Sequence, residues 1–252
     1  MTFNKADLQK EHYEKIYEDY DKSYYDAPSM AFRQKFVYDI MFQDLDLNNK
    51  NVADLASGSG FNSLAVMERY PKARLTGFDI SSKACRGYRQ NTGCDAYEID
   101  LTKSIDISQT FDIAMIFGGI HHCVYDLDST FRNIASILKP GGVLLMWEPN
   151  KECFLDKIRS FWYQADKYFE ADTEDSLVHQ ELLNLASNYY SSMDVHYMGG
   201  PAYFLILNSL VFRIPIAIKP IIAPPLFLAE QVYNKLPHKI WFPYFIARWS
   251  KK

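Results

Sequence analysis

Segments typical of strands and of helices alternate from Val52 to Pro149, and this alternation limits the fold more than any other feature of the chain. The runs VADL, ARLTGFDI, DAYEID, FDIAMIFGG and VLLMWEP are typical of strands, and FNSLAVMERY, SSKACRGYRQN and STFRNIASILK are typical of helices. Such alternation predicts a parallel sheet that is covered by helices on both faces. We expect an α/β fold with a doubly wound, mostly parallel sheet of seven strands.

The loop Ser57–Gly60 directly follows the first of these strands, and Asp79 ends the second strand 19 positions after Gly60. In a doubly wound sheet, ligands bind outside the carboxyl ends of the strands, where the strand order reverses. Gly58 and Gly60 permit a sharp turn and a close approach of the backbone to a ligand. A carboxylate at Asp79 is suited to accept hydrogen bonds from both hydroxyls of a ribose. The loop and the acid together predict a ligand that contains a nucleoside.

A nicotinamide dinucleotide also fits a glycine loop of this kind, but its fingerprint requires a third glycine. Ser63 stands at that position, and Asp54 lies inside the strand, which gives the pattern D-x-x-x-G-x-G. This pattern resembles the first motif of class I S-adenosylmethionine-dependent methyltransferases of the small-molecule type. Further resemblances follow in order over about Lys50 to Pro149: FDIS, the acid at the end of DAYEID, the strand FDIAMIFGGIHH, and LKPGG before a buried strand.

The resemblance implies that the cofactor is S-adenosylmethionine and that no metal is needed. It implies that Asp54 fixes the loop of Ser57, Gly58 and Gly60 and binds the amino group of the methionine moiety, directly or through water. An acid inside an apolar strand is unfavourable unless it is paired, although Asp54 would also suit a bridge within the loop.

The other cofactor-binding residues implied by the resemblance lie at the ends of the next strands. Asp79, followed by Ile80, would bind the ribose, and a turn acid at the surface is the alternative for Asp79. Asp100 and Leu101 would bracket the adenine, although either Glu98 or Asp100 would suit a solvated position. The last pair, Phe117 and Gly118, would lie beside the sulfonium or the carboxyl end of the cofactor.

His121 and His122 follow the fourth strand and are expected at the mouth of the site. Histidine is the natural general base near neutral pH, and a hydroxyl acceptor needs one. We therefore name His121 as the candidate catalytic base, with packing or loop hydrogen bonding as the alternative. Glu148 and Asn150, just past the fifth strand, either face the acceptor or cap the following helix.

The N-terminal segment Lys5–Leu47 shows helical spacing and precedes the alternating region. In the enzymes that the chain resembles, this segment closes over the cofactor, where a tyrosine hydroxyl and an arginine hold the methionine carboxylate. Arg33 is one candidate, and the choice among the tyrosines stays open: Tyr13, Tyr17, Tyr20, Tyr24 and Tyr25.

The segment after Pro149 has a different character. CFLDKIRSFWYQADKYF and SLVHQELLNLASNYY predict two long helices, Met193–Met198 predicts a strand, and IWFPYFIARW predicts an edge strand. Between them, Tyr203–Leu228 is strongly apolar and suits core packing, an acceptor pocket, a homodimer surface or a peripheral membrane contact. Its prolines are expected to interrupt any long amphipathic helix. We expect residues 1–47 to form a helical cap, 48–150 the cofactor-binding core and 151–252 an acceptor-binding lobe with the closing strands, all within one structural domain.

Charge and cysteine usage exclude several other classes of function. The formal net charge is −4 without any basic run, which argues against a nucleic-acid partner. The four cysteines stand far apart, so they suggest neither a zinc pair nor a redox motif. The charged N-terminus is unlike a signal peptide, and we expect a cytoplasmic protein with reduced thiols.

These features predict methyl transfer to a small, apolar or amphiphilic acceptor, at a hydroxyl oxygen of a natural product, lipid or sugar. Carbon methylation of a quinone-like or aromatic lipid is the alternative that the apolar C-terminal region motivates. A nicotinamide-dependent oxidoreductase is a third candidate, which the absent third glycine and the lack of an obvious Tyr-x-x-x-Lys pair oppose. A binding protein that retained the fold without catalysis is a fourth.

Overall fold

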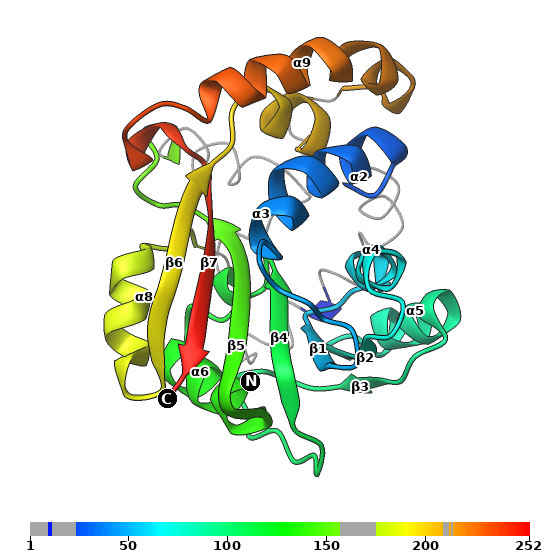
Figure 1. The fold of residues 1–252 in the computed structure, drawn as a ribbon, viewed down its shortest axis with the longest axis vertical. Helices are drawn as coiled ribbons and strands as arrows, with labels where there is room; N and C mark the ends of the chain where they lie inside the picture. The colour runs from blue at the N-terminus through cyan, green and yellow to red at the C-terminus, as the bar shows by residue number, and fades with distance from the viewer. Residues whose placement is uncertain (1–9, 12–23, 157–174, 209–211, 213) are drawn as a thin grey trace.

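The predicted α/β architecture is confirmed by a computed structural model, which describes residues 10–11, 24–156, 175–208, 212 and 214–252. The seven-stranded sheet has the order β3-β2-β1-β4-β5-β7-β6 (Figure 1). Its strands are β1 (Asn51–Leu55), β2 (Arg74–Asp79), β3 (Ala96–Glu98), β4 (Phe111–Phe117), β5 (Leu138–Pro149), β6 (Tyr190–Met198) and β7 (Tyr244–Lys251). Neighbours from β3 to β5 are parallel, whereas β7 is antiparallel to both β5 and β6.

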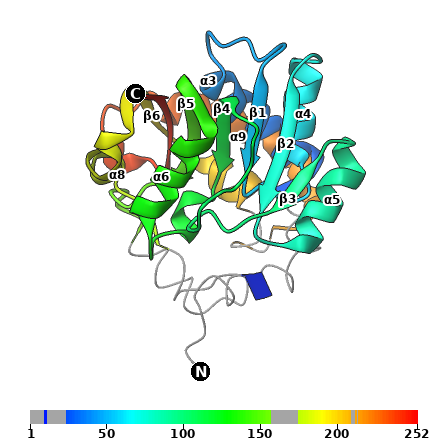
Figure 2. The same ribbon diagram turned by 90° about the horizontal axis from the view of Figure 1, so that it is seen from below.

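Helices cover both faces of the sheet, as Figure 2 shows in a view from below. The crossover helices are α4 (Phe61–Arg69), α5 (Ser82–Thr92) and α6 (Leu127–Ile137). The described N-terminal helices are α2 (Ala27–Arg33), the π-helix η1 (Gln34–Tyr38) and α3 (Asp39–Met41). Later elements are α8 (His179–Leu185), η3 (Ala186–Asn188), η4 (Tyr203–Leu207), η5 (Ile216–Ile218), α9 (Lys219–Tyr233) and η6 (Lys239–Trp241). The short η2 (Ile120–His122) follows β4.

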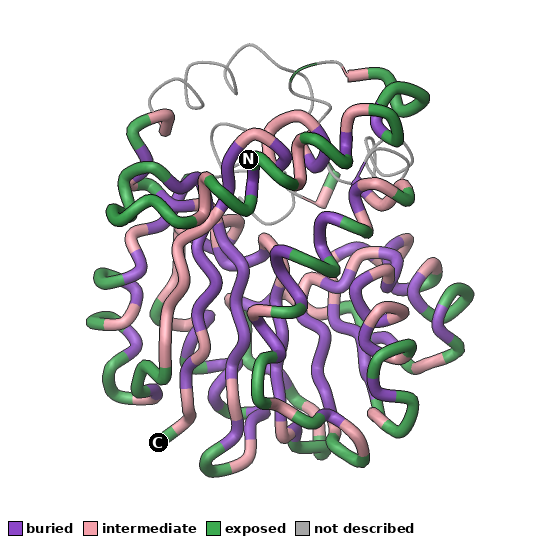
Figure 3. The backbone as a smooth tube through the Cα atoms, turned by 45° about the horizontal axis from the view of Figure 1, so that its top comes forward, coloured by how far each residue is buried: buried purple, intermediate pink, exposed green. Residues whose placement is uncertain are grey.

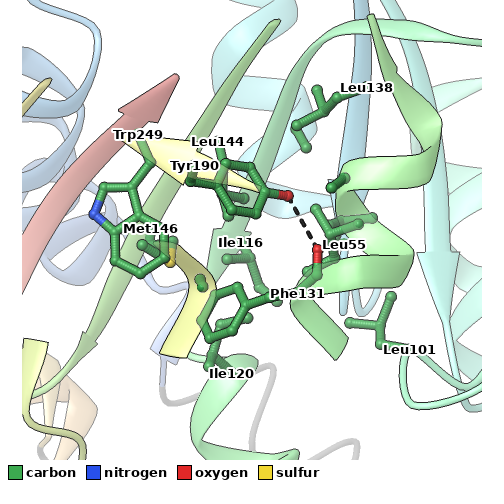
Figure 4. Packing of buried hydrophobic residues seen from close by; sticks show 14 of the residues in the cluster. Leu55, Leu101, Ile116, Ile120, Phe131, Leu138, Leu144, Met146, Tyr190 and Trp249 are labelled. Carbon is green, nitrogen blue, oxygen red and sulfur yellow. Dashed lines mark hydrogen bonds between the residues drawn. The ribbon is translucent and has the colours of Figure 1, made fainter. Parts of the chain in front are cut away.

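Two apolar layers hold these helices on the sheet. On the face that α6 and α8 cover, Phe131 and Trp249 pack with ring centroids 5.2 Å apart, and the Tyr190 hydroxyl donates to the Phe131 carbonyl at 3.3 Å (Figure 4). The opposite face carries α2, α3, α4 and α9. The central strands are buried along most of their length (Figure 3), because a sheet that is covered on both faces selects continuous apolar runs.

The sequence predicted that IWFPYFIARW forms an edge strand, and this prediction is wrong. β7 lies between β5 and β6, and β6 forms the edge. Phe245 and Trp249 face one apolar layer and Ile246 faces the other. A strand buried on both faces reads as a continuous apolar run, which does not reveal its position in the sheet.

Two predicted helices differ from the structure. SLVHQELLNLASNYY was predicted as one long helix, but α8 ends at Leu185 and β6 begins at Tyr190, before the predicted strand at Met193–Met198. The prolines of Tyr203–Leu228 were predicted to interrupt any long helix, yet α9 runs for 15 residues through Pro224 and Pro225. Both prolines lie on the exposed side of α9. The helix predicted from CFLDKIRSFWYQADKYF lies largely outside the described residues.

The topology places the connections after β1, β2 and β4 at one edge of the sheet. β2 and β3 extend the sheet to one side of β1, whereas β4 and β5 extend it to the other side. The strand order therefore reverses between β1 and β4, which is where a doubly wound sheet binds its ligands.

Candidate functional site

The glycine loop connects β1 to α4 at this reversal point. Gly58 and Gly60 have φ values of +52° and +84°, in the left-handed region that favours glycine. A Cβ on Gly60 would come within 2.7 Å of Thr92 and 2.8 Å of Tyr88, whereas a Cβ on Gly58 would meet nothing within 4 Å. Gly60 thus permits α4 and α5 to pack closely, and Gly58 faces open space.

Asp54 lies beneath the loop and is buried. Its Oδ2 accepts a hydrogen bond from the Ser63 hydroxyl at 2.7 Å, and this hydroxyl is also 2.7 Å from that of Tyr88. The other oxygen, Oδ1, has no hydrogen-bond partner among the described residues. Burial raises the pKa of Asp54 to about 8. Asp54 therefore holds the first turn of α4 through Ser63, directly after the glycine loop.

Asp79 joins the glycine loop to the start of α5. Its Oδ2 accepts from the Gly58 N–H at 2.9 Å, and its Oδ1 accepts from the Ser81 N–H at 2.8 Å. Burial raises the pKa of Asp79, and these backbone donors partly oppose the increase. Both oxygens keep a second lone pair for further donors. Asp79 is therefore a positioned acceptor rather than an acid on a surface turn.

These elements surround a pocket with an empty space of about 1010 Å³, including its open mouth. Seven predicted cofactor-binding residues line the pocket: Gly58, Asp79, Ile80, Asp100, Leu101, Phe117 and Gly118. Three predicted residues lie outside its lining: Asp54, Ser57 and Gly60. The lining residues that the sequence analysis did not name as site residues are Ala56, Ser81, Ala84, Ile99, Gly119, Cys123 and Tyr125.

The two acids at the end of β3, Glu98 and Asp100, have different surroundings. Glu98 is exposed and pairs with Lys10, whereas Asp100 lines the pocket. The Oδ1 of Asp100 accepts from the backbone N–H and the hydroxyl of Thr102, at 2.9 and 2.7 Å. Asp100 is thus held at the pocket wall, beside the buried Leu101. The flanking Ile99 shares this position and gave no separate signal in the sequence.

Among the N-terminal candidates, Tyr25 and Arg33 lie at the site. Tyr25 lines the pocket, and the guanidinium of Arg33 lies 4.6 Å from its ring centroid and 5.0 Å from that of Trp147. The Arg33 Nη1 donates to the Asn62 side chain at 3.5 Å, in the first turn of α4. The Tyr24 hydroxyl instead donates to Asn208. The other three tyrosines, Tyr13, Tyr17 and Tyr20, lie outside the described residues.

His121 is held by Glu148 across the gap between the ends of β4 and β5. The Nδ1 of His121 lies 2.8 Å from Oε2 of Glu148, whose Oε1 accepts from the Gly119 and Ile120 N–H groups at 2.9 and 2.8 Å. Glu148 is buried, and burial raises its pKa to about 8 against the effect of these donors. The Glu148 side chain therefore orients the imidazole through Nδ1, and Nε2 is the remaining ring nitrogen for a contact with a ligand.

The two histidines occupy different positions relative to the pocket. His122 lines it, whereas His121 does not, although the rings lie 3.8 Å apart. The Cε1 of His121 would be 3.4 Å from a Cβ on Gly118, which itself lines the pocket. Asn150 does not act at the pocket, because its side chain donates to the Lys239 and Phe242 carbonyls at 3.1 and 2.9 Å. It holds the segment that leads into β7.

Two general features concern the described residues alone. Within them, no group of three or more His, Cys, Asp or Glu side chains could hold a metal ion. No helix in the described part of the chain is both long and apolar enough to span a membrane.

Comparison with known proteins assigns the central region to a family. Residues 52–142 match the family model described as "Methyltransferase domain". The ubiquinone/menaquinone biosynthesis C-methyltransferase UbiE of Desulfotalea psychrophila is 32% identical over 94 residues, which are 36% of this chain and 38% of that protein. The malonyl-[acyl-carrier protein] O-methyltransferase of Legionella pneumophila is 22% identical over 178 residues, which are 66% of this chain and 62% of that protein.

The chain thus spans less than two thirds of the length of these curated relatives. Similarity to solved structures extends further. The plantazolicin methyltransferase BpumL, in complex with S-adenosylhomocysteine, superposes with a TM-score of 0.59 at 16% identity, covering 98% of this chain and 95% of that one. The fold of the whole chain is therefore the methyltransferase fold. Residues 52–142 thus match a methyltransferase domain, and the class I, Rossmann-like fold around them is shared with a methyltransferase that was solved with S-adenosylhomocysteine bound.

Proposed function

We propose that this protein transfers the methyl group of S-adenosylmethionine to a hydroxyl oxygen of a small, apolar or amphiphilic acceptor. The observation that carries the proposal is the contact between His121 and the buried Glu148 beside the pocket. A hydroxyl is a poor nucleophile until a base removes its proton. A histidine that a carboxylate holds in place is suited to this task near neutral pH.

The pocket fits the parts of the proposed cofactor. Asp79 has lone pairs for the ribose hydroxyls, and Asp100 with Leu101 suits an exocyclic amine and a flat ring. Arg33 provides a cation for the methionine carboxylate, near Tyr25 in the pocket wall. The buried Oδ1 of Asp54, without a hydrogen-bond partner among the described residues, is an acceptor that an ammonium group can reach directly or through water.

The proton transfer follows from the hydrogen bonds of His121. The bound cofactor supplies an electrophilic methyl group on a sulfonium. When the Nδ1–H of His121 donates to Glu148, Nε2 is the unprotonated nitrogen of the neutral imidazole and would take the proton of the acceptor hydroxyl. Asp79, Asp100 and Arg33 would hold S-adenosylmethionine, which would supply the methyl group to the acceptor oxygen and would leave as S-adenosylhomocysteine. Holding the two reactants in line supplies most of the remaining acceleration.

Carbon methylation of a quinone-like or aromatic lipid is the second candidate. The relative with 32% identity is named as a C-methyltransferase of ubiquinone and menaquinone biosynthesis. This match covers 36% of the chain. The family match to methyltransferases removes the reason to retain a nicotinamide-dependent oxidoreductase.

Product analysis distinguishes the two candidates. The protein is incubated with S-adenosylmethionine and a panel of fatty alcohols, phenols and quinols, and the methylated atom is located by mass spectrometry and NMR. We expect a methyl ether product, and His121→Ala should reduce turnover by roughly a hundredfold or more. The matched control is His196→Ala, which removes an exposed histidine from β6. Methylation at carbon, or unchanged turnover in His121→Ala, would refute the proposal.

A further inference from the structure

The outward side of α9 exposes apolar side chains that proteins normally bury. Ile221, Leu228 and Val232 keep 75%, 66% and 69% of their surface exposed. The other exposed residues of α9 are Pro220, Pro224, Pro225, Ala229 and Gln231, so a single polar residue interrupts this side. Exposed apolar surface of this extent on a helix indicates a contact with another apolar surface.

The charged residues of α9 face the interior of the protein, whereas those of an ordinary surface helix face solvent. Lys219 and Glu230 are the only charged residues of the helix, and both are fully buried. Lys219 pairs with Asp26, and its Nζ also donates to the Ser29 hydroxyl of α2 at 3.0 Å. Glu230 accepts from the N–H groups of Gly200 and Ala202 at 2.8 and 2.9 Å. Charged groups thus attach α9 to the protein, and the outward side carries no charge.

The segments on either side of α9 continue the exposed surface. Ile216 and Ile218 in η5 are exposed by 45% and 44%, and Ile240 and Trp241 in η6 by 44% and 37%. Lys235 adds an exposed cation next to this surface, whereas the exposed Lys239 pairs with Glu152, with Nζ and Oε1 2.6 Å apart. The only acidic residue between positions 214 and 241 is the buried Glu230. The surface is therefore apolar with a basic margin, and this charge pattern is complementary to an anionic interface with an apolar interior.

The position of α9 connects this surface with the pocket. α9 lies across the end of the molecule toward which β6 points (Figure 1). β6 and β5 run in the same direction, because both are antiparallel to β7. This end is therefore also where the carboxyl ends of β4 and β5 lie. Phe227 of α9 packs on Phe36 of η1, with ring centroids 5.6 Å apart, immediately after the helix that carries Arg33.

We propose that α9, with η5 and η6, docks this protein on the surface of an anionic lipid bilayer, with the helix in the plane of the membrane. An in-plane helix inserts its apolar side at the boundary of the headgroups, while nearby lysines attract anionic lipids and a tryptophan lies at the interface. This inference concerns attachment and is independent of the methylated atom. The prolines of α9 do not oppose the proposal, because the helix is continuous through Pro224 and Pro225.

Vesicle flotation with the full chain tests the proposal. The vesicles contain phosphatidylcholine alone, or phosphatidylcholine mixed with phosphatidylglycerol. We expect the protein to float with the anionic vesicles, and the triple variant Ile221→Glu/Leu228→Glu/Val232→Glu to lose at least about tenfold in partitioning. The matched control is Leu185→Glu, an exposed leucine on α8, and it should float like the wild type. Lys235→Gln should weaken binding to anionic vesicles by about fivefold and leave binding to neutral vesicles unaffected.

Titration with S-adenosylhomocysteine separates a docking defect from unfolding, because the triple variant should keep its affinity for this ligand. Loss of flotation with retained affinity supports the proposal. Three outcomes would overturn it: a wild-type protein that does not float, a triple variant that floats like the wild type, or a Leu185→Glu variant that loses flotation equally. Sedimentation equilibrium covers the remaining case. A wild-type dimer that the triple variant dissociates, without flotation, would assign the surface to self-association and refute docking on lipid.

Discussion

Replacing each loop glycine by alanine separates the packing role of Gly60 from the ligand-facing role of Gly58. Both residues have positive φ, so alanine is strained at either position by about 1–2 kcal/mol. At position 60 the new Cβ would also overlap Thr92 at 2.7 Å and Tyr88 at 2.8 Å. Overpacking of this kind adds about 1–3 kcal/mol. We therefore expect Gly60→Ala to lower the free energy of unfolding by about 2–5 kcal/mol and Gly58→Ala by about 1–2 kcal/mol.

For ligand binding we expect the opposite ranking, with the larger effect in Gly58→Ala. A Cβ on Gly58 meets no protein atom within 4 Å, and Gly58 lines the pocket. The added methyl group therefore occupies space that the proposed cofactor needs. We expect Gly58→Ala to weaken binding of S-adenosylhomocysteine by at least about tenfold, because close backbone approach at this position is lost.

Gly93→Ala provides the matched control for the backbone strain. Gly93 ends α5 with φ +70°, and a Cβ there would also meet nothing within 4 Å. It should lose about as much stability as Gly58→Ala and keep its ligand affinity. Differential scanning calorimetry gives the stabilities, and isothermal titration calorimetry gives the affinities. A Gly58→Ala variant that binds like the wild type, or a Gly60→Ala variant that is no less stable than Gly93→Ala, would contradict these two roles.

Three further predictions concern buried charged groups. Burial raises the pKa values of Asp54 and Glu148 to about 8 and of Glu230 to about 7. Because these values lie above those in the unfolded chain, the stabilising contribution of the three groups is complete at low pH and is lost as the pH rises through 7 to 8. Urea unfolding of the ligand-free protein at pH 6.5 and 8.5 should show this decrease in the free energy of unfolding. The pKa of His179 is lowered, so its titration affects stability mainly below this pH range. A flat or rising stability would contradict the prediction. Glu148→Gln should reduce kcat by roughly 10- to 100-fold with little change in KM. It should also shift the acidic limb of the pH–rate profile, where the His121 base becomes protonated, because Glu148 orients His121; an unchanged profile would assign Glu148 a structural role alone. Lys219→Met should destabilise the protein by about 3–5 kcal/mol by leaving Asp26 without its buried partner, and Asp26→Asn in the same chain should restore part of that loss; an equally unstable double variant would argue against this pairing.

The central part of the fold could be predicted from the sequence because its signals are local. Alternating strand and helix patterns between Val52 and Pro149 fix the class of sheet, and the topology then brings the strand ends together. The C-terminal part depends on long-range pairing. The position of β7 between β5 and β6 is decided by tertiary contacts, and the continuity of α9 through two prolines is opposed by local propensity.

The site shows the same division. Asp79, Asp100 and Gly118 follow strands whose carboxyl ends meet at one edge, so their proximity follows from the topology. Arg33 reaches the site only through tertiary packing between Tyr25 and Trp147, which no spacing in the sequence indicates. The sequence does contain a signal for the role of Glu148. β4 and β5 are neighbours in any sheet of this class, so an acid at the end of β5 lies next to the loop of His121.

The ligand of the pocket can be identified by calorimetric titration with S-adenosylhomocysteine and with NAD⁺, on the wild-type chain and on Asp79→Ala. We expect S-adenosylhomocysteine to bind at one site and NAD⁺ not to bind. Removing the Asp79 carboxylate should weaken binding by about tenfold or more for each ribose hydrogen bond that is lost. Binding of NAD⁺ alone, or S-adenosylhomocysteine binding that Asp79→Ala leaves unchanged, would contradict the assignment of this pocket.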